Sequence, residues 1–169
     1  RRLGLRKTGM VAEKKMLDAI VDLAQKCGYK RTSIWTYTRE GAPRYSSVTR
    51  ERFVSIGAGA ASLKSGYFYL NTFDVGQYIN AVKKDLPVSI GMKMPARLEM
   101  LYWLYWRMYD LNIPVQRFLE LFHEPIKRRF SLLLAALRIC GLAVLEDDSF
   151  KLTPKGAYLF HLVEKGHSW

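Results

Sequence analysis

The sequence predicts an α+β protein: the end of an α/β domain with a short β-hairpin, followed by a mainly helical, winged-helix-like domain. Three observations lead to this fold class. A helical repeat of apolar residues over 11–27 runs directly into a segment rich in β-branched and aromatic residues. A glycine-rich turn between apolar runs occupies residues 53–74. From residue 96 onward the apolar spacing is helical, interrupted by one hairpin pattern.

The first predicted domain spans residues 1–94. Its helix over 11–27 carries apolar residues at helical spacing, and Gly28 is a typical C-terminal stop. The segment "YKRTSIWTYTR" predicts a strand over about 31–38. A helix followed at once by a strand is half of a βαβ unit, which cannot bury a sheet by itself. A polar loop is expected over 39–50.

The glycine turn is expected between two short strands, "RFVSI" at 52–56 and "YFYLN" at 67–71. A helix over about 74–84 follows, with Asp74 near its start, where a negative charge is favourable for the helix dipole. Residues 85–95, "DLPVSIGMKMP", are interpreted as a connector. The change of composition there places the domain boundary.

The second predicted domain spans residues 95–169 and is mainly helical. A hairpin is expected over 143–152, with a turn at Glu146–Ser149. Thr153 is placed to cap a final helix that has Pro154 at its first position. Three helices are expected before the hairpin, within "ARLEMLYWLYWRMYDLN", "VQRFLELFHE" and "PIKRRFSLLLAALRICG". Three helices, a β-wing and a closing helix make a winged-helix arrangement.

Charge is concentrated at the start of the chain. The formal net charge is +12, and residues 1–50 hold 12 Lys and Arg against 4 Asp and Glu. A positive field of this kind attracts nucleic acid, anionic lipid or a small polycarboxylate, and a solvated basic surface is the alternative. Hydrophobic residues make up 49% of the chain, which argues against disorder. No run of 18 apolar residues occurs, so no membrane-spanning helix is expected, and no membrane is expected among the partners.

The two cysteines, Cys27 and Cys140, stand far apart, and no CxxC or Cys/His cluster accompanies them. A zinc site or iron–sulfur cluster held by this chain is therefore not expected. Both cysteines lie in apolar helical context, which predicts buried reduced thiols and a cytoplasmic, disulfide-free protein. His123, His161 and His167 are scattered, so packing or surface roles are expected ahead of haem ligation.

The glycine turn "GAGAAS" at 57–62 lacks the pattern of a phosphate-binding loop. Ser62 occupies the place of the third glycine of the dinucleotide fingerprint, and Lys64 does not follow a glycine as in a P-loop. The residues after the turn indicate a strand, whereas phosphate loops lead into a helix N-terminus. Two interpretations remain: close backbone approach to a planar or bulky ligand, and a tight bend.

The order of these motifs resembles the C-terminal half of radical SAM enzymes. The closest group is the oxygen-independent coproporphyrinogen III oxidase family, which includes haem chaperones. The segments that carry the resemblance are "CGYKRTSIWTYTREG", "RFVSIGAGAASL", "YFYLNTFDVGQYINAV" and "GLAVLEDDSFKLTPKGAYL". Residues that match the family's glycine turn and the motifs after it are Gly57, Gly59, Ala60, Ser62, Asn71 and Tyr78. Trp35 and Tyr37 depart from the family's usual strand motif.

The resemblance implies that this chain holds the terminal βα piece of an α/β barrel and the domain after it. The family's cluster-binding CxxxCxxC and its glycine-rich SAM-contacting segments are absent. S-adenosylmethionine and a [4Fe–4S] cluster are therefore implied for a longer parent, with none held by this chain, which is expected to be inactive alone. The residues implied to lie near the substrate or SAM are Gly57, Gly59, Ala60, Ala61, Ser62 and Leu63.

In this reading the parent is a radical SAM oxidoreductase that acts on a tetrapyrrole. This chain supplies substrate-side walls and a lid, and its basic first third suits the substrate's carboxylates. Its partners would be the rest of the barrel and the tetrapyrrole. Because a single βα unit exposes apolar surface, a homodimer or a swapped strand is also expected.

Two other functions compete with this one. In a winged-helix module that binds nucleic acid, Lys127, Arg128 and Arg129 would contact phosphates. Against it, that helix is apolar after its first turn, and the wing "LEDDSF" is acidic where DNA would approach. A haem- or protein-interaction module using His123 or His161 is the third alternative.

Overall fold

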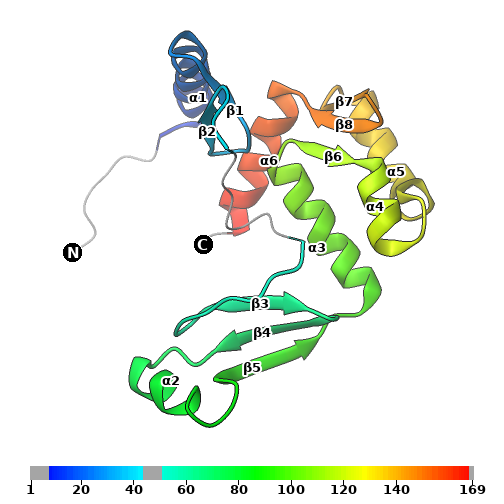
Figure 1. Cartoon of the computed structure of the whole chain (residues 1–169). Coiled ribbons are helices and arrows are strands. Elements are labelled where there is room, and N and C mark those ends of the chain that lie inside the picture. Colours follow the sequence, from blue (N-terminus) through cyan, green and yellow to red (C-terminus); the bar gives the residue numbers. More distant parts are fainter. Residues whose placement is uncertain (1–7, 44–50, 168–169) are drawn as a thin grey trace.

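The computed structural model describes residues 8–43 and 51–167, and Figure 1 shows their arrangement. In chain order the elements are α1 (Met10–Lys26), β1 (Tyr29–Arg31), β2 (Tyr37–Arg39), β3 (Ala61–Lys64), β4 (Tyr67–Asn71), α2 (Val75–Ala81), β5 (Val88–Lys93), α3 (Ala96–Tyr109), β6 (Asn112–Pro114), α4 (Val115–Phe122), α5 (Ile126–Ile139), β7 (Ala143–Glu146), β8 (Ser149–Leu152) and α6 (Pro154–His167). The mixture of helices with small sheets confirms the α+β class.

The strands form three small sheets, with orders β1-β2, β3-β4-β5 and β6-β8-β7. Every strand pair within the described residues is antiparallel. The β3-β4-β5 sheet lies at one end of α3, and the hairpin β1-β2 lies with α1 beside α6 at the other end (Figure 1). The barrel piece, the winged helix and the boundary at residue 94 stay predictions.

The single strand expected over 31–38 is wrong: the chain turns back within it to form β1 and β2. The hydroxyl of Ser33 accepts hydrogen bonds from the backbone N–H groups of Trp35 and Thr36, which closes a tight turn. Ile34 at the tip is fully buried, and its N–H donates to the carbonyl of Tyr109 at the end of α3. The hairpin is therefore attached to the helical part of the molecule.

The strand expected over 52–56 is also wrong, because this segment contributes only an isolated bridge between Phe53 and Leu63. The connector expected over 85–95 instead contains β5, which pairs with β4. Its apolar residues alternate along the chain, but the pairing with β4 shifts register between Leu70 and Asn71. The polar loop over 39–50 lies partly outside the described residues.

Helix α2 begins as expected, since Asp74 caps it by accepting a hydrogen bond from Gln77 N–H at 2.6 Å. It ends three residues earlier than predicted. The helices and hairpin of the second half are confirmed, and the Thr153 hydroxyl caps α6 through the N–H of Gly156 at 3.1 Å. The main apolar core lies between these elements and contains Met100, Trp103, Leu104, Ile113, Phe118, Ile126, Leu134, Leu137, Ala143 and Phe150.

Candidate functional site

The glycine turn takes its shape from two backbone positions that only glycine adopts easily. Gly57 has a φ of 119° and Gly59 a φ of 69°. The turn leads into β3 and not into a helix, so it lacks the helix N-terminus on which phosphate loops rely. The Gly59 N–H donates to the carbonyl of Thr72 at 2.8 Å, which ties the turn to the end of β4.

Two side chains from different elements hold Gly57 in place. The amide nitrogen of Asn71, at the end of β4, donates to the Gly57 carbonyl at 2.9 Å. The Gly57 N–H donates to the phenolic oxygen of Tyr78, on α2, at the same distance. Asn71 is buried. Asn71 and Tyr78, which the resemblance to the family singled out beside the glycines, therefore brace the turn itself.

The six predicted site residues divide into two groups. Gly57, Gly59, Ala60 and Ala61 are partly exposed. Ser62 and Leu63 are buried, and the Ser62 hydroxyl accepts a hydrogen bond from Ser55 N–H at 3.0 Å. The Ser62 hydroxyl thus ties the segment before the turn to β3, while the glycines and alanines are the more exposed part of the turn.

Two exposed apolar residues flank the turn and were not predicted from the sequence. Ile56, immediately before Gly57, is 90% exposed, and Phe73 is 66% exposed. A Cβ atom on Gly59 would lie 3.0 Å from the Phe73 ring. The Phe73 ring therefore lies beside Gly59, and Ile56 exposes a second apolar side chain just before Gly57. The sequence shows only that both residues are apolar and stand near the glycines, which does not distinguish an exposed side chain from a buried one.

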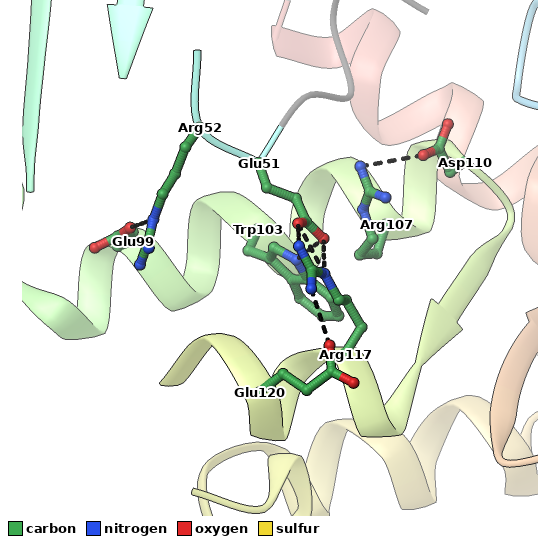
Figure 2. A network of polar contacts seen from close by, with 8 residues as sticks. All are labelled: Glu51, Arg52, Glu99, Trp103, Arg107, Asp110, Arg117 and Glu120. Atoms are coloured by element: carbon green, nitrogen blue, oxygen red, sulfur yellow. Dashed lines mark hydrogen bonds and ion pairs between the residues drawn. The ribbon is translucent and has the colours of Figure 1, made fainter. Parts of the chain in front are cut away.

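The segment that enters the turn is fixed to helices α3 and α4 at Glu51 (Figure 2). The Glu51 carboxylate accepts hydrogen bonds from Trp103 Nε1 at 3.0 Å and from Arg117 at 2.6 and 2.9 Å. Burial raises the pKa of the Glu51 carboxyl, but the hydrogen bonds from Arg117 and Trp103 outweigh it and hold this pKa below its ordinary value. Nearby, Arg52 pairs with Glu99 at 3.5 Å.

The predictions for the histidines are partly confirmed. His161 is buried on α6, where it contacts the Trp35 ring and lies 3.0 Å from a carboxylate oxygen of Glu13. It has a packing role between α6, α1 and the first hairpin. His123 ends α4 in a left-handed conformation, with a φ of 56°. The side chain of His167 lies outside the described residues.

The prediction that both thiols are buried is wrong. Cys27 and Cys140 are exposed, because each lies just past the end of its helix, at the C-caps of α1 and α5. Within the part of the chain that the structure describes, no group of three or more His, Cys, Asp or Glu side chains could hold a metal ion. The resemblance implies the iron–sulfur cluster for a longer parent, and the two cysteines of this sequence do not make up the ligand set that such a cluster takes.

No family model matches this chain, and no curated protein does. A solved structure does. It is that of coproporphyrinogen III oxidase (HemN) from Escherichia coli, which is described as a radical SAM enzyme. The match covers 91% of this chain with a TM-score of 0.63 and 13% sequence identity. The two proteins therefore share a fold over this stretch.

The chain spans 40% of the length of that HemN structure, so the match concerns only part of the enzyme. The resemblance seen in the sequence is supported at the level of the fold. Among residues 8–43 and 51–167, no helix is long and apolar enough to cross a membrane.

Proposed function

We propose that this chain is the C-terminal, substrate-side part of a radical SAM oxidoreductase that acts on a tetrapyrrole. The observation that carries the proposal is the fold shared with HemN over 91% of the chain. The bracing of Gly57 by Asn71 and Tyr78 supports it, because these are the residues that the family's motifs select around the turn.

In this proposal the glycine turn lines the substrate side of the active site. Gly57 to Ala61 offer a surface without large side chains, so a ring system or SAM can approach the backbone closely. Asn71 and Tyr78 keep that backbone in one conformation, which avoids an ordering cost when the ligand binds. Ile56 and Phe73 add apolar contact area at the edge of the turn.

The radical chemistry belongs to groups that this chain does not hold. A [4Fe–4S] cluster and SAM would supply hydrogen abstraction in the parent, and no step through them is assigned to residues here. What the chain's own residues do is orient substrate and exclude water beside the glycine turn. Arg31 is one of the basic residues expected to pair with substrate carboxylates. Its guanidinium already donates to the carbonyls of Ser33 and Ile34 inside its own hairpin, which leaves fewer N–H groups for a substrate.

The nucleic-acid alternative finds less support. Arg128 and Arg129, expected to contact phosphates, both pair with the carboxylate of Glu124, at 3.9 and 3.0 Å. On the wing, Lys151 pairs with Glu146 at 3.0 Å. Charges that are neutralised within the protein contribute less to counterion release on DNA.

Titration of the chain with coproporphyrin III, a fluorescent tetracarboxylate tetrapyrrole, tests the proposal. We expect saturable quenching, weakened at least severalfold by Ile56→Asp, since a carboxylate beside the turn repels the substrate's acids and removes apolar contact. Leu132→Asp is the matched control, because Leu132 is 86% exposed on α5, away from the turn. No saturable binding, or equal weakening by both substitutions, would contradict the proposal.

A further inference from the structure

Helices α3, α5 and α6 line an apolar groove of about 560 Å³ that shares no residue with the glycine turn. Each helix contributes residues at the spacing i, i+3, i+4 and i+7, starting at Leu101 on α3, Leu133 on α5 and Gly156 on α6. This spacing puts them on one face of each helix over two turns, a length of about 10 Å. Leu142 and Leu152 complete the lining. The groove has the size of a small-molecule site.

The lining of the groove is almost entirely hydrocarbon, and none of the described residues that form it is charged. Leu104 and Phe160 are buried, whereas Leu101 and Val163 at the rim are 44% and 46% exposed. The rings of Tyr105 and Phe160, with centroids 5.1 Å apart, hold α3 against α6. Such a groove favours an occupant whose inner part has no polar groups, because these groups would lose their hydrogen bonds to water.

The two ends of the groove differ in charge. At one end, the Lys155 ammonium donates to the carbonyl of Cys140, a lining residue, at 3.0 Å. An ammonium has three N–H groups, so it can bind an anion and keep this contact. Two turns further along α6, Glu164 follows the lining residue Val163, and its carboxylate accepts from Trp35 Nε1 at 3.3 Å. A negative group is therefore attracted at the Lys155 end and repelled at the other.

We propose that this groove binds a fatty acid, with its alkyl chain between the three helices and its carboxylate at Lys155. An alkyl chain needs no hydrogen bonds, and its transfer from water to a hydrocarbon lining is favourable. The net charge of +12 adds a general attraction for anions. A helical peptide is the competing occupant, but a segment that covers two turns is too short to be helical by itself, and its ordering on binding costs affinity.

Calorimetric titration of the full chain with decanoate, whose extended length matches two helical turns, tests the proposal. We expect one saturable site. Hexanoate should bind more weakly, by about fourfold for each methylene group that it lacks. Decanol should also bind more weakly than decanoate, because it has no charge to pair with Lys155. Absence of saturable binding, or decanol that binds as tightly as decanoate, would overturn the proposal.

Two neighbouring alanines of α5 distinguish the groove from general adsorption to apolar surface. Both are exposed, but Ala136 lines the groove, whereas Ala135 lies on the face of α5 toward β7. Ala136→Phe fills part of the groove and should weaken decanoate binding at least tenfold. Ala135→Phe is the matched control and should leave binding unchanged, with circular dichroism to check both folds. Equal affinities of the two variants would contradict a site in this groove.

The position of the carboxylate is tested at the two ends of the groove. Lys155→Gln keeps an N–H donor for the Cys140 carbonyl but removes the charge, so it should weaken decanoate severalfold and leave decanol unchanged. Glu164→Gln removes the charge at the other end and should not weaken decanoate. Decanoate that binds equally well to Lys155→Gln and to the unmodified chain would show that the headgroup does not lie there, against the proposal.

The two thiols provide a measurement that needs no substitution. Cys27 and Cys140 are both exposed, but Cys140 lines the groove and Cys27 ends α1. Saturating decanoate should slow the alkylation of Cys140 by N-ethylmaleimide at least severalfold and leave that of Cys27 unchanged, as measured by mass spectrometry of the peptides. Protection of neither thiol, or of both equally, would overturn the proposal. The groove lies outside the glycine turn, so these outcomes do not depend on the proposed function.

Discussion

The phenolic oxygen of Tyr78 accepts a hydrogen bond from the Gly57 N–H at 2.9 Å, so a helix 21 residues away holds the glycine turn. On the other side of the same residue, the Gly57 carbonyl accepts from Asn71. Both backbone groups of Gly57 are thus satisfied by side chains, and its carbonyl also accepts from the Ala60 N–H at 3.3 Å, so contacts from inside and outside the turn hold the conformation with a φ of 119°.

We expect Tyr78→Phe to lower the free energy of unfolding by about 1 kcal/mol, since it removes one hydrogen bond from a half-buried site. Asn71→Ala should cost more, because Asn71 is buried and its loss also leaves a gap in the sheet. Urea unfolding measures both. Tyr67→Phe, at a position that is 52% exposed on β4, is the control and should be neutral. A Tyr78→Phe chain as stable as the unmodified one would show that the contact contributes nothing.

Acid should release the clamp at Glu51. Its carboxyl pKa lies below the ordinary value of 4.5 when folded, so it binds protons less readily than in the unfolded chain. The stability it provides is present above that ordinary value and is lost as the pH falls through the folded pKa. Glu51→Gln should therefore cost about 1–3 kcal/mol at neutral pH and converge with the unmodified chain in acid.

The control for this prediction is Glu120→Gln. Glu120 also pairs with Arg117, at 2.9 Å, but its side chain is 49% exposed, so the loss should stay below about 1 kcal/mol. Unfolding free energies measured from pH 7 down to the acid limit of reversible folding compare the two variants. Parallel curves for Glu51→Gln and the unmodified chain would show that the carboxylate charge does not hold the segment.

What the sequence predicted well are the elements whose signal is local. The helical spacing of apolar residues predicted α1 and α3. The hydroxyl of Thr153, directly before Pro154, predicted the cap of α6. The first hairpin was missed because its turn depends on the Ser33 hydroxyl and on burial of Ile34 against the distant α3. Strand β5 was missed because Pro87 and Gly91 favour a loop, while its pairing with β4 is decided by tertiary contact.

The candidate site shows the same division. The sequence identified the glycines, Asn71 and Tyr78, but not which of them contact one another. The exposed flanks Ile56 and Phe73 could not be predicted, since an apolar residue in a short run is expected to be buried.

The basic start of α5 offers a direct test against nucleic acid. We expect no tight binding of duplex DNA by the chain and no steep loss of binding with rising salt. Lys127→Ala should leave the fold unchanged. Arg129→Ala should cost stability slightly, because Glu124 is 12% exposed and loses a partner at 3.0 Å. Nanomolar duplex binding that falls steeply with salt and is lost in Lys127→Ala would favour the winged-helix alternative.

The two glycines of the turn should respond differently to an added methyl group. The sequence left two causes open for them, an unusual backbone angle or close approach of a ligand. Both have left-handed φ, so the conformational cause operates at both positions. The surroundings differ: a Cβ on Gly57 would meet no atom within 4 Å, whereas one on Gly59 would press on the Phe73 ring at 3.0 Å.

We expect Gly59→Ala to lower the free energy of unfolding by about 1–2 kcal/mol. One part comes from the backbone, because a φ of 69° is unfavourable for alanine. The other part comes from the contact between the new Cβ and the Phe73 ring. Adding Phe73→Ala should remove the second part, so the double variant loses less than the two single losses combined. Gly57→Ala has no contact to relieve, but its φ of 119° lies where alanine is strained, so its cost should persist in the Phe73→Ala background. A double-mutant cycle by urea unfolding separates the two. If the stability losses of Gly59→Ala and Phe73→Ala add without coupling, the Phe73 ring does not constrain the turn. Close approach of a ligand would then be the remaining explanation for the space beside Gly59.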